Sequence, residues 1–113
     1  MDLSTIFFKR ALKTKEVALD KQARENILIS IGLNHLKTKD YDDARKIFET
    51  CLKEIPNGAQ VDTAFLGIVT AQLNKGKIKD AEKTLEQFRA SYPNSPVIQQ
   101  AEQMLQQTAN VKN

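Results

Sequence analysis

The sequence predicts an all-α protein of about six helices, arranged as successive antiparallel helix pairs. The first observation is internal self-similarity. When the sequence is aligned with itself at a shift of 37 residues, Ala44 aligns with Ala81 and Pro56 aligns with Pro93. Helical spacing is the second, since apolar residues recur every three or four positions in both copies. Composition is the third: 4 glycines and 3 prolines among 113 residues leave few turns between the helices.

The totals indicate one globular domain spanning residues 1–113. Hydrophobic residues make up 41% of the chain and charged residues 27%, which is typical of globular proteins. The net charge of +3 does not indicate a nucleic-acid binder, because such proteins usually carry a clustered basic patch. The single cysteine excludes an intramolecular disulfide, and no apolar run is long enough to span a membrane.

The first residues, MDLSTIFFKRALK, place their charges after the apolar cluster, whereas a secretory signal has the reverse order. A cytoplasmic location is therefore the default expectation. The bacterial periplasm is the alternative if a signal peptide was removed ahead of this N-terminus.

Residues 1–19 are expected to form an N-terminal packing helix with a wide apolar arc. The arc consists of Leu3, Ile6, Phe7, Phe8, Ala11, Leu12, Val17, Ala18 and Leu19. In one interpretation this helix turns near residue 20, where Asp20 caps the next helix, and covers the first helix pair. In the other interpretation it continues into the next helix as one rod and pairs two chains.

Residues 21–56 are expected to form the first helix pair. The first helix, residues 25–37, is apolar on nearly all sides, which predicts that it is buried. Asp40 is expected to cap the second helix. Pro56 cannot continue a helix and ends the unit. The apolar face of the second helix consists of Ala44, Phe48, Cys51, Leu52 and Ile55.

Residues 58–93 are expected to form the second helix pair, whose first helix covers residues 62–75. Lys77 stands where the first pair has Asp40 and cannot cap, so the turn depends on Gly76. The small Ala44 and Ala81 are expected where the two helices of each pair cross closely, with Gly32 as the partner in the first pair. The apolar face of the second helix consists of Ala81, Leu85, Phe88 and Tyr92, and Pro93 ends the unit.

Residues 95–109 are expected to form a capping helix, with Ser95 as N-cap and Pro96 as the first helical residue. Ala101 lies 37 residues after Ala64, which indicates the first helix of a third, incomplete copy. Residues 110–113 are expected to be a frayed tail. A polar outer face, as a solenoid end requires, is supplied by Gln99, Gln100, Gln103, Gln106 and Gln107.

A further pattern is that Leu28, Ile31, Gly32 and His35 precede Ala44, Phe48 and Pro56 at fixed intervals. This order resembles the tetratricopeptide repeat, whose unit carries W-x₂-L-G-x₂-Y, then A-x₃-F and P. The chain departs from it, with Leu28 in place of Trp and His35 in place of Tyr. The resemblance implies a short right-handed α-solenoid of two degenerate repeats plus a capping helix. The segment FRASYPNSPVIQQAEQML is also similar to tetratricopeptide proteins of the bacterial envelope, so a bacterial source is expected.

The resemblance implies a concave groove, formed by the first helix of each pair, that binds an extended peptide or a helix. By register the groove residues are Asn26, Ile29, Leu33, Leu36, Lys37, Thr63, Leu66, Thr70, Leu73 and Asn74. Ile29 and Leu33 stand where the carboxylate-gripping form of the family has Lys and Asn, which argues against capture of a C-terminal carboxylate. An apolar groove favours an amphipathic helix. The simpler interpretation is that these residues are core beneath the N-terminal helix.

No constellation of residues predicts catalysis, a metal or a cofactor. His35 and Cys51 are interpreted as packed core residues, because each is the only one of its kind and lies on a buried face. Asp40, Asp42 and Asp43 are typical of a helix start. Four lysines, Lys75, Lys77, Lys79 and Lys83, surround one turn and could contact phosphate or an acidic protein, although a solvated turn is the simpler interpretation.

These observations favour a non-catalytic scaffold that binds a protein or peptide partner. The alternative function is self-association, as a homodimer formed through the apolar N-terminal helix or a solenoid end. An enzyme or a nucleic-acid binder is disfavoured, because neither a chemical site nor a clustered basic patch is evident.

Overall fold

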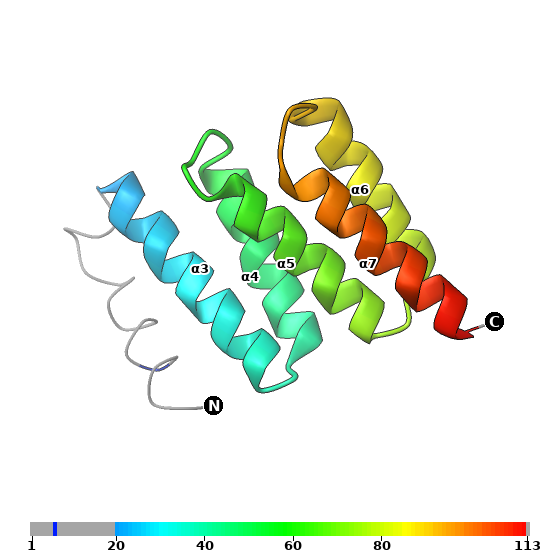
Figure 1. Ribbon diagram of the computed structural model, residues 1–113. Coiled ribbons are helices and arrows are strands. Elements are labelled where there is room, and N and C mark those ends of the chain that lie inside the picture. Colours follow the sequence, from blue (N-terminus) through cyan, green and yellow to red (C-terminus); the bar gives the residue numbers. More distant parts are fainter. Residues whose placement is uncertain (1–5, 7–19, 113) are drawn as a thin grey trace.

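The computed structural model describes Ile6 and residues 20–112, and all regular structure in these residues is helical (Figure 1). The helices are α3 (Lys21–Lys37), α4 (Tyr41–Glu54), α5 (Val61–Asn74), α6 (Ile78–Ser91) and α7 (Val97–Lys112). The all-α prediction is confirmed. The additional helix expected over residues 1–19 lies outside the described residues, apart from Ile6.

The helices form two layers of a tetratricopeptide-like solenoid (Figure 1). Each helix packs against the next one in the chain, so that α3 and α4 form one hairpin and α5 and α6 form another. In addition, α3 contacts α5 and α5 contacts α7, which makes these three helices one layer. Helices α4 and α6 lie on the other side of it. The predicted groove residues therefore belong to two neighbouring helices of one layer.

Helix α3 begins with the cap that the sequence indicated. The Asp20 backbone is extended, and its carboxylate accepts a hydrogen bond of 3.2 Å from the Ala23 backbone N–H. An N-cap of this kind satisfies one of the free amides of the first turn. Because the helix begins at Lys21, the interpretation as one uninterrupted rod through residue 20 is wrong.

The expected side-chain cap of α4 by Asp40 is absent. Asp40 occupies the N-cap position, but its carboxylate turns back toward the preceding turn and accepts a 2.7 Å hydrogen bond from the Thr38 hydroxyl. His35 Nδ1 lies 3.8 Å from the same carboxylate. The hydrogen bond from Thr38 is the main reason that the pKa of Asp40 lies below its ordinary value. The carboxylate therefore organises the turn rather than the helix end.

The two hairpin turns use a left-handed residue at equivalent positions. Gly76 has φ of 76°, which confirms the predicted glycine turn, and Lys39, 37 residues earlier, has φ of 64°. Glycine adopts this conformation freely, whereas a side chain with a Cβ is strained there. The first hairpin therefore tolerates a strain that the second avoids.

The helix ends at the prolines also follow the prediction. Helix α4 ends at Glu54 before Pro56, and α6 ends at Ser91 before Pro93. Ser95 caps the last helix, because its hydroxyl accepts a 3.3 Å hydrogen bond from the Val97 backbone N–H. Helix α7 continues to Lys112, beyond its expected end.

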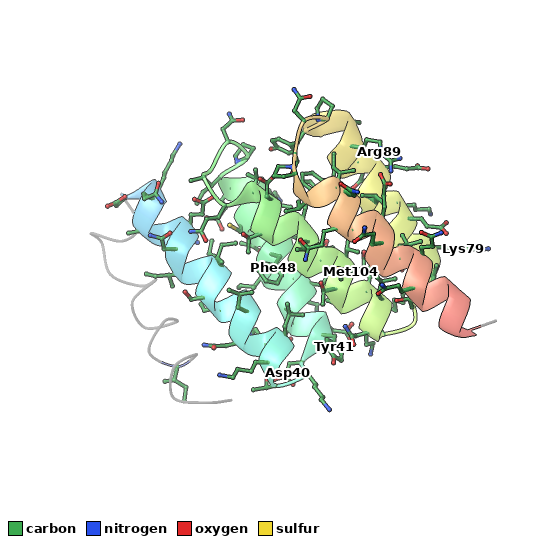
Figure 2. All side chains as sticks on the ribbon, viewed as in Figure 1. Asp40, Tyr41, Phe48, Lys79, Arg89 and Met104 are labelled. Atoms are coloured by element: carbon green, nitrogen blue, oxygen red, sulfur yellow. The ribbon has the colours of Figure 1, made fainter. Side chains whose placement is uncertain are left out.

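The core of the first hairpin is built around Phe48, which is fully buried. Its ring lies against two glycines, one from the same hairpin and one from the next. A Cβ atom added at Gly32 would lie 2.5 Å from the ring, and one added at Gly67 would lie 2.4 Å from it. Ala44 is also fully buried, as predicted for the helix crossing. Glycine thus makes room for one large aromatic ring between three helices (Figure 2).

The core of the second hairpin distributes its volume differently. Val69 and Leu85, the equivalents of Gly32 and Phe48, are both buried, with Ala81 at the crossing. Phe88 stacks on Phe65 with ring centroids 4.3 Å apart. Aromatic pairs of this kind add to the free energy of area burial alone.

Candidate functional site

The predicted groove residues of α3 separate into buried and accessible side chains. Ile29 is 3% exposed and belongs to the core, in agreement with the simpler interpretation. Leu33 is 47% exposed, although leucine is normally buried. Leu36 is half-buried, and Asn26 and Lys37 are exposed. The accessible apolar group on this helix is therefore Leu33, with polar residues at either end.

The predicted residues of α5 also divide. Leu73 is 7% exposed and packs in the core cluster of α5, α6 and α7, so it is not free to line a groove. The physical reason is that α7 packs directly beside α5. Leu66, Thr63 and Thr70 are half-buried, and Asn74 is exposed.

Two side chains of α5 are held by their own helix. The Thr70 hydroxyl donates to the Leu66 carbonyl at 2.8 Å, and the Asn74 amide donates to the Thr70 carbonyl at 2.8 Å. These bonds fix the orientation of the polar groups along this side of α5. Because Leu33 and Thr70 occupy equivalent positions on adjacent helices, they face the same side of the layer.

The α3–α5 face is the name used below for the accessible part of the predicted groove. It consists of Asn26, Leu33, Lys37, Thr63, Leu66, Thr70 and Asn74. An exposed leucine is its centre, and its other members are neutral polar groups, one lysine and one half-buried leucine. The chemistry of this face suits a segment with apolar anchors and polar backbone groups rather than a highly charged ligand.

The buried polar residues predicted as core are in the core. His35 is 4% exposed, beside Asp40. Cys51 is 1% exposed, and burial is the main cause that raises the pKa of its thiol to about 11. A thiol with such a pKa remains protonated near neutral pH and is a poor nucleophile.

Sequence reasoning missed Glu25, a fully buried carboxylate at the start of α3. Its Oε2 atom accepts a 3.1 Å hydrogen bond from the backbone N–H of Gln60, immediately before α5. Gly58 permits this approach, since a Cβ atom there would lie 1.8 Å from Oε2. Glu25 therefore ties the start of α3 to the start of α5. The only signal in the sequence was the acidic residue Asp62 at the equivalent position.

Asp62 makes the corresponding connection one helix pair later. Its carboxylate accepts a 2.6 Å hydrogen bond from the Ser95 hydroxyl, which in turn caps α7. The Tyr92 hydroxyl also donates to the Pro56 carbonyl, so that consecutive inter-hairpin loops are linked. These bonds set the spacing of α3, α5 and α7 and thereby position the α3–α5 face.

The described residues contain no group of three or more His, Cys, Asp and Glu arranged to hold a metal ion. Across the same part of the chain, no helix combines the length and apolarity needed to traverse a bilayer.

Comparison with known protein families gives a match over most of the chain. A family model described as YfiO, outer membrane lipoprotein, matches residues 21–112, which include all of α3 to α7. No curated protein matches the chain.

Proposed function

Because the chain belongs to the YfiO family of outer membrane lipoproteins, we propose that it is a non-catalytic scaffold that binds another envelope protein through the α3–α5 face. The partner segment is an amphipathic helix or an extended peptide with at least one apolar anchor. The family description, outer membrane lipoprotein, favours a location at the outer membrane over the cytoplasmic default, and we propose that the scaffold lies on the periplasmic side of that membrane.

The observation that carries this proposal is the exposure of Leu33. It is 47% exposed on a helix whose other apolar residues are buried or half-buried. A binding segment would remove the exposed half of this leucine from water, which contributes about 1 kcal/mol, roughly half of the value for burying a fully exposed leucine. The half-buried Leu66 on α5 supplies a second apolar contact. Helix-in-groove binding uses spaced apolar anchors of this kind.

The polar members of the face support the same function. Asn26 accepts a hydrogen bond from the Gln60 side-chain amide, which leaves its own amide hydrogens available to a ligand. Asn74 is exposed at the end of α5 opposite Thr63. Lys37 is likewise exposed at the end of α3 opposite Asn26. Donors along both helices can therefore contact the backbone carbonyls of a bound segment.

The test is a pull-down from the envelope fraction with the double variant Leu33→Lys/Thr70→Lys. Both side chains are at least partly accessible, so lysine can be accommodated and the variant should remain folded by circular dichroism. We expect the partner retained by the wild type to be lost. Leu73→Lys is unsuitable, because a charge at that buried position would test folding instead.

The matched control is Ala90→Lys/Asn94→Lys, which adds two lysines at exposed positions of α6 and the loop after it. This variant should retain the partner. Equal retention by both variants would contradict the proposed face. Light scattering over a range of concentrations distinguishes the alternative, since a homodimer would show a concentration-dependent mass and the scaffold would not.

A further inference from the structure

A recessed pocket lies between α4 and α6, outside the α3–α5 face. It has a volume of about 350 Å³ and is lined by Arg45, Gln72, Lys77, Asp80, Lys83, Thr84 and Gln87. One of these residues is on α4, one is on α5 and the others belong to α6 or its N-cap. The pocket therefore depends on the packing of three helices.

The floor of the pocket consists of two nearly buried polar side chains. Gln72 is 9% exposed and Thr84 is 8% exposed. The Thr84 hydroxyl lies 2.9 Å from Gln72 Oε1 and 3.0 Å from the Asp80 backbone carbonyl oxygen, and these two acceptors share its single hydrogen. The Gln72 amide nitrogen bonds to no acceptor in the described part of the chain, and it is not enclosed by protein. Because Gln72 lines the pocket, its amide N–H₂ is a donor that a ligand bound there can use.

The rim of the pocket is mainly cationic. Arg45 is paired with Glu49, one turn further along α4. Among the described residues, neither Lys77 nor Lys83 forms an ion pair with an acid. Asp80 contributes one negative charge. With the Arg45 pair neutral, the rim carries a net charge of about +1, which complements a single negative charge.

The first hairpin has only part of this chemistry. Lys77 is equivalent to Asp40, so the rim position has the opposite charge, and Thr84 is equivalent to the apolar Ile47. Lys83 and Gln72, by contrast, are equivalent to Lys46 and to the buried polar residue His35, so the Lys77 cation and the Thr84 hydroxyl are what distinguish the second hairpin.

We propose that this pocket binds the side-chain carboxylate of an acidic protein partner. The Gln72 amide donates to one carboxylate oxygen, while Lys77 and Lys83 pair with the group from the rim. A phosphate monoester carries close to two negative charges and would face the carboxylate of Asp80. A membrane surface is also disfavoured, because the donor at the floor is recessed between helices, where a planar array of headgroups does not reach.

The experiment is an NMR titration of the ¹⁵N-labelled chain with a tetra-glutamate peptide whose ends are acetylated and amidated. The side-chain amide signal of Gln72 should shift with this peptide and not with the matched tetra-glutamine peptide. Lys77→Asp, which introduces the residue of the first hairpin, should weaken binding about tenfold or more, as expected for a lost charge-assisted hydrogen bond.

Lys79→Asp is the control, because it makes the same change of charge two residues away, outside the pocket lining. Its side chain points away from the helices (Figure 2). Equal weakening by Lys79→Asp, or equal shifts with tetra-glutamine, would overturn the proposal. It would also be overturned if inorganic phosphate or phosphatidylglycerol vesicles shifted the Gln72 signal at lower concentration than tetra-glutamate.

Discussion

The hairpins α3–α4 and α5–α6 place equivalent residues 37 positions apart, yet they fill the space between their helices in different ways. In the first hairpin, a glycine and a phenylalanine meet, Gly32 and Phe48. In the second, the equivalent residues Val69 and Leu85 share the volume more evenly. The difference teaches that the bulk at a crossing can be concentrated in one side chain or divided between two, in line with the tolerance of cores to apolar replacements in general.

The largest expected effect comes from removing the aromatic ring. Phe48→Ala should lower the free energy of unfolding by about 3–5 kcal/mol, because the ring is fully buried between helices of both hairpins. Leu85→Ala should cost less, about 2–3 kcal/mol, since Leu85 also lines a surface pocket between α6 and α7 that water can enter. The free energy of unfolding of each variant is measured by urea unfolding. A larger loss of stability for Leu85→Ala than for Phe48→Ala would contradict this prediction.

A double-mutant cycle tests whether the glycine–phenylalanine pair of the first hairpin can be replaced by the valine–leucine pair of the second. Gly32→Val alone should cost about 1–3 kcal/mol, because its side chain would overlap the Phe48 ring. Adding Phe48→Leu recreates the pair found in the second hairpin and should recover part of that loss. We expect a coupling energy of about 1 kcal/mol or more, measured by denaturant unfolding.

The rescue should remain incomplete, because Gly67 also contacts the ring and leaves space when Phe48 is shortened. Strictly additive losses in the double variant would show that the two residues do not share the crossing.

The connections between hairpins provide the next comparison. Glu25→Ala removes a fully buried side chain that accepts a hydrogen bond from the Gln60 backbone N–H and should cost about 1–3 kcal/mol, because the donor loses its partner and a cavity is left. Asp62→Ala should cost about 0.5–1.5 kcal/mol, because Asp62 is only half-buried and the Ser95 hydroxyl can turn to water. Thermal unfolding of both variants compares them, and an equal or smaller loss for Glu25→Ala would contradict the inferred role of burial.

The smallest expected effect is at the hairpin turns. Lys39→Gly should stabilise the chain by about 0.5–1 kcal/mol, because it removes a side chain from a left-handed backbone position. Gly76→Lys introduces the same strain into the second hairpin and should destabilise the chain by a similar amount. Melting temperatures that move in the same direction for both substitutions would show that the two turns are not equivalent.

Sequence periodicity predicted the elements well because helical faces and terminators are local properties. The crossing residues Ala44 and Ala81 are fully buried, and the helices end before Pro56 and Pro93, as expected. Local pattern could not indicate the direction of the Asp40 side chain, which depends on the hydroxyl of Thr38 in the turn.

Contacts between distant residues were also beyond the sequence pattern. Glu25 reaches Gln60 across 35 residues, and nothing in the spacing of either residue predicts that bond. The groove prediction was limited for the same reason. Helical register placed both Leu33 and Leu73 in the predicted groove. In the structure α7 packs against α5 and buries Leu73, whereas Leu33 on α3 remains accessible.

The most direct test of the proposed scaffold is site-specific photo-crosslinking in intact bacterial envelopes, with the probe at position 33 and, separately, at position 53 of α4. Both wild-type side chains are exposed, so the probe perturbs neither core. If the α3–α5 face binds a partner, position 33 will give a discrete protein adduct and position 53 will not. An adduct from position 53 with none from position 33 would contradict the account.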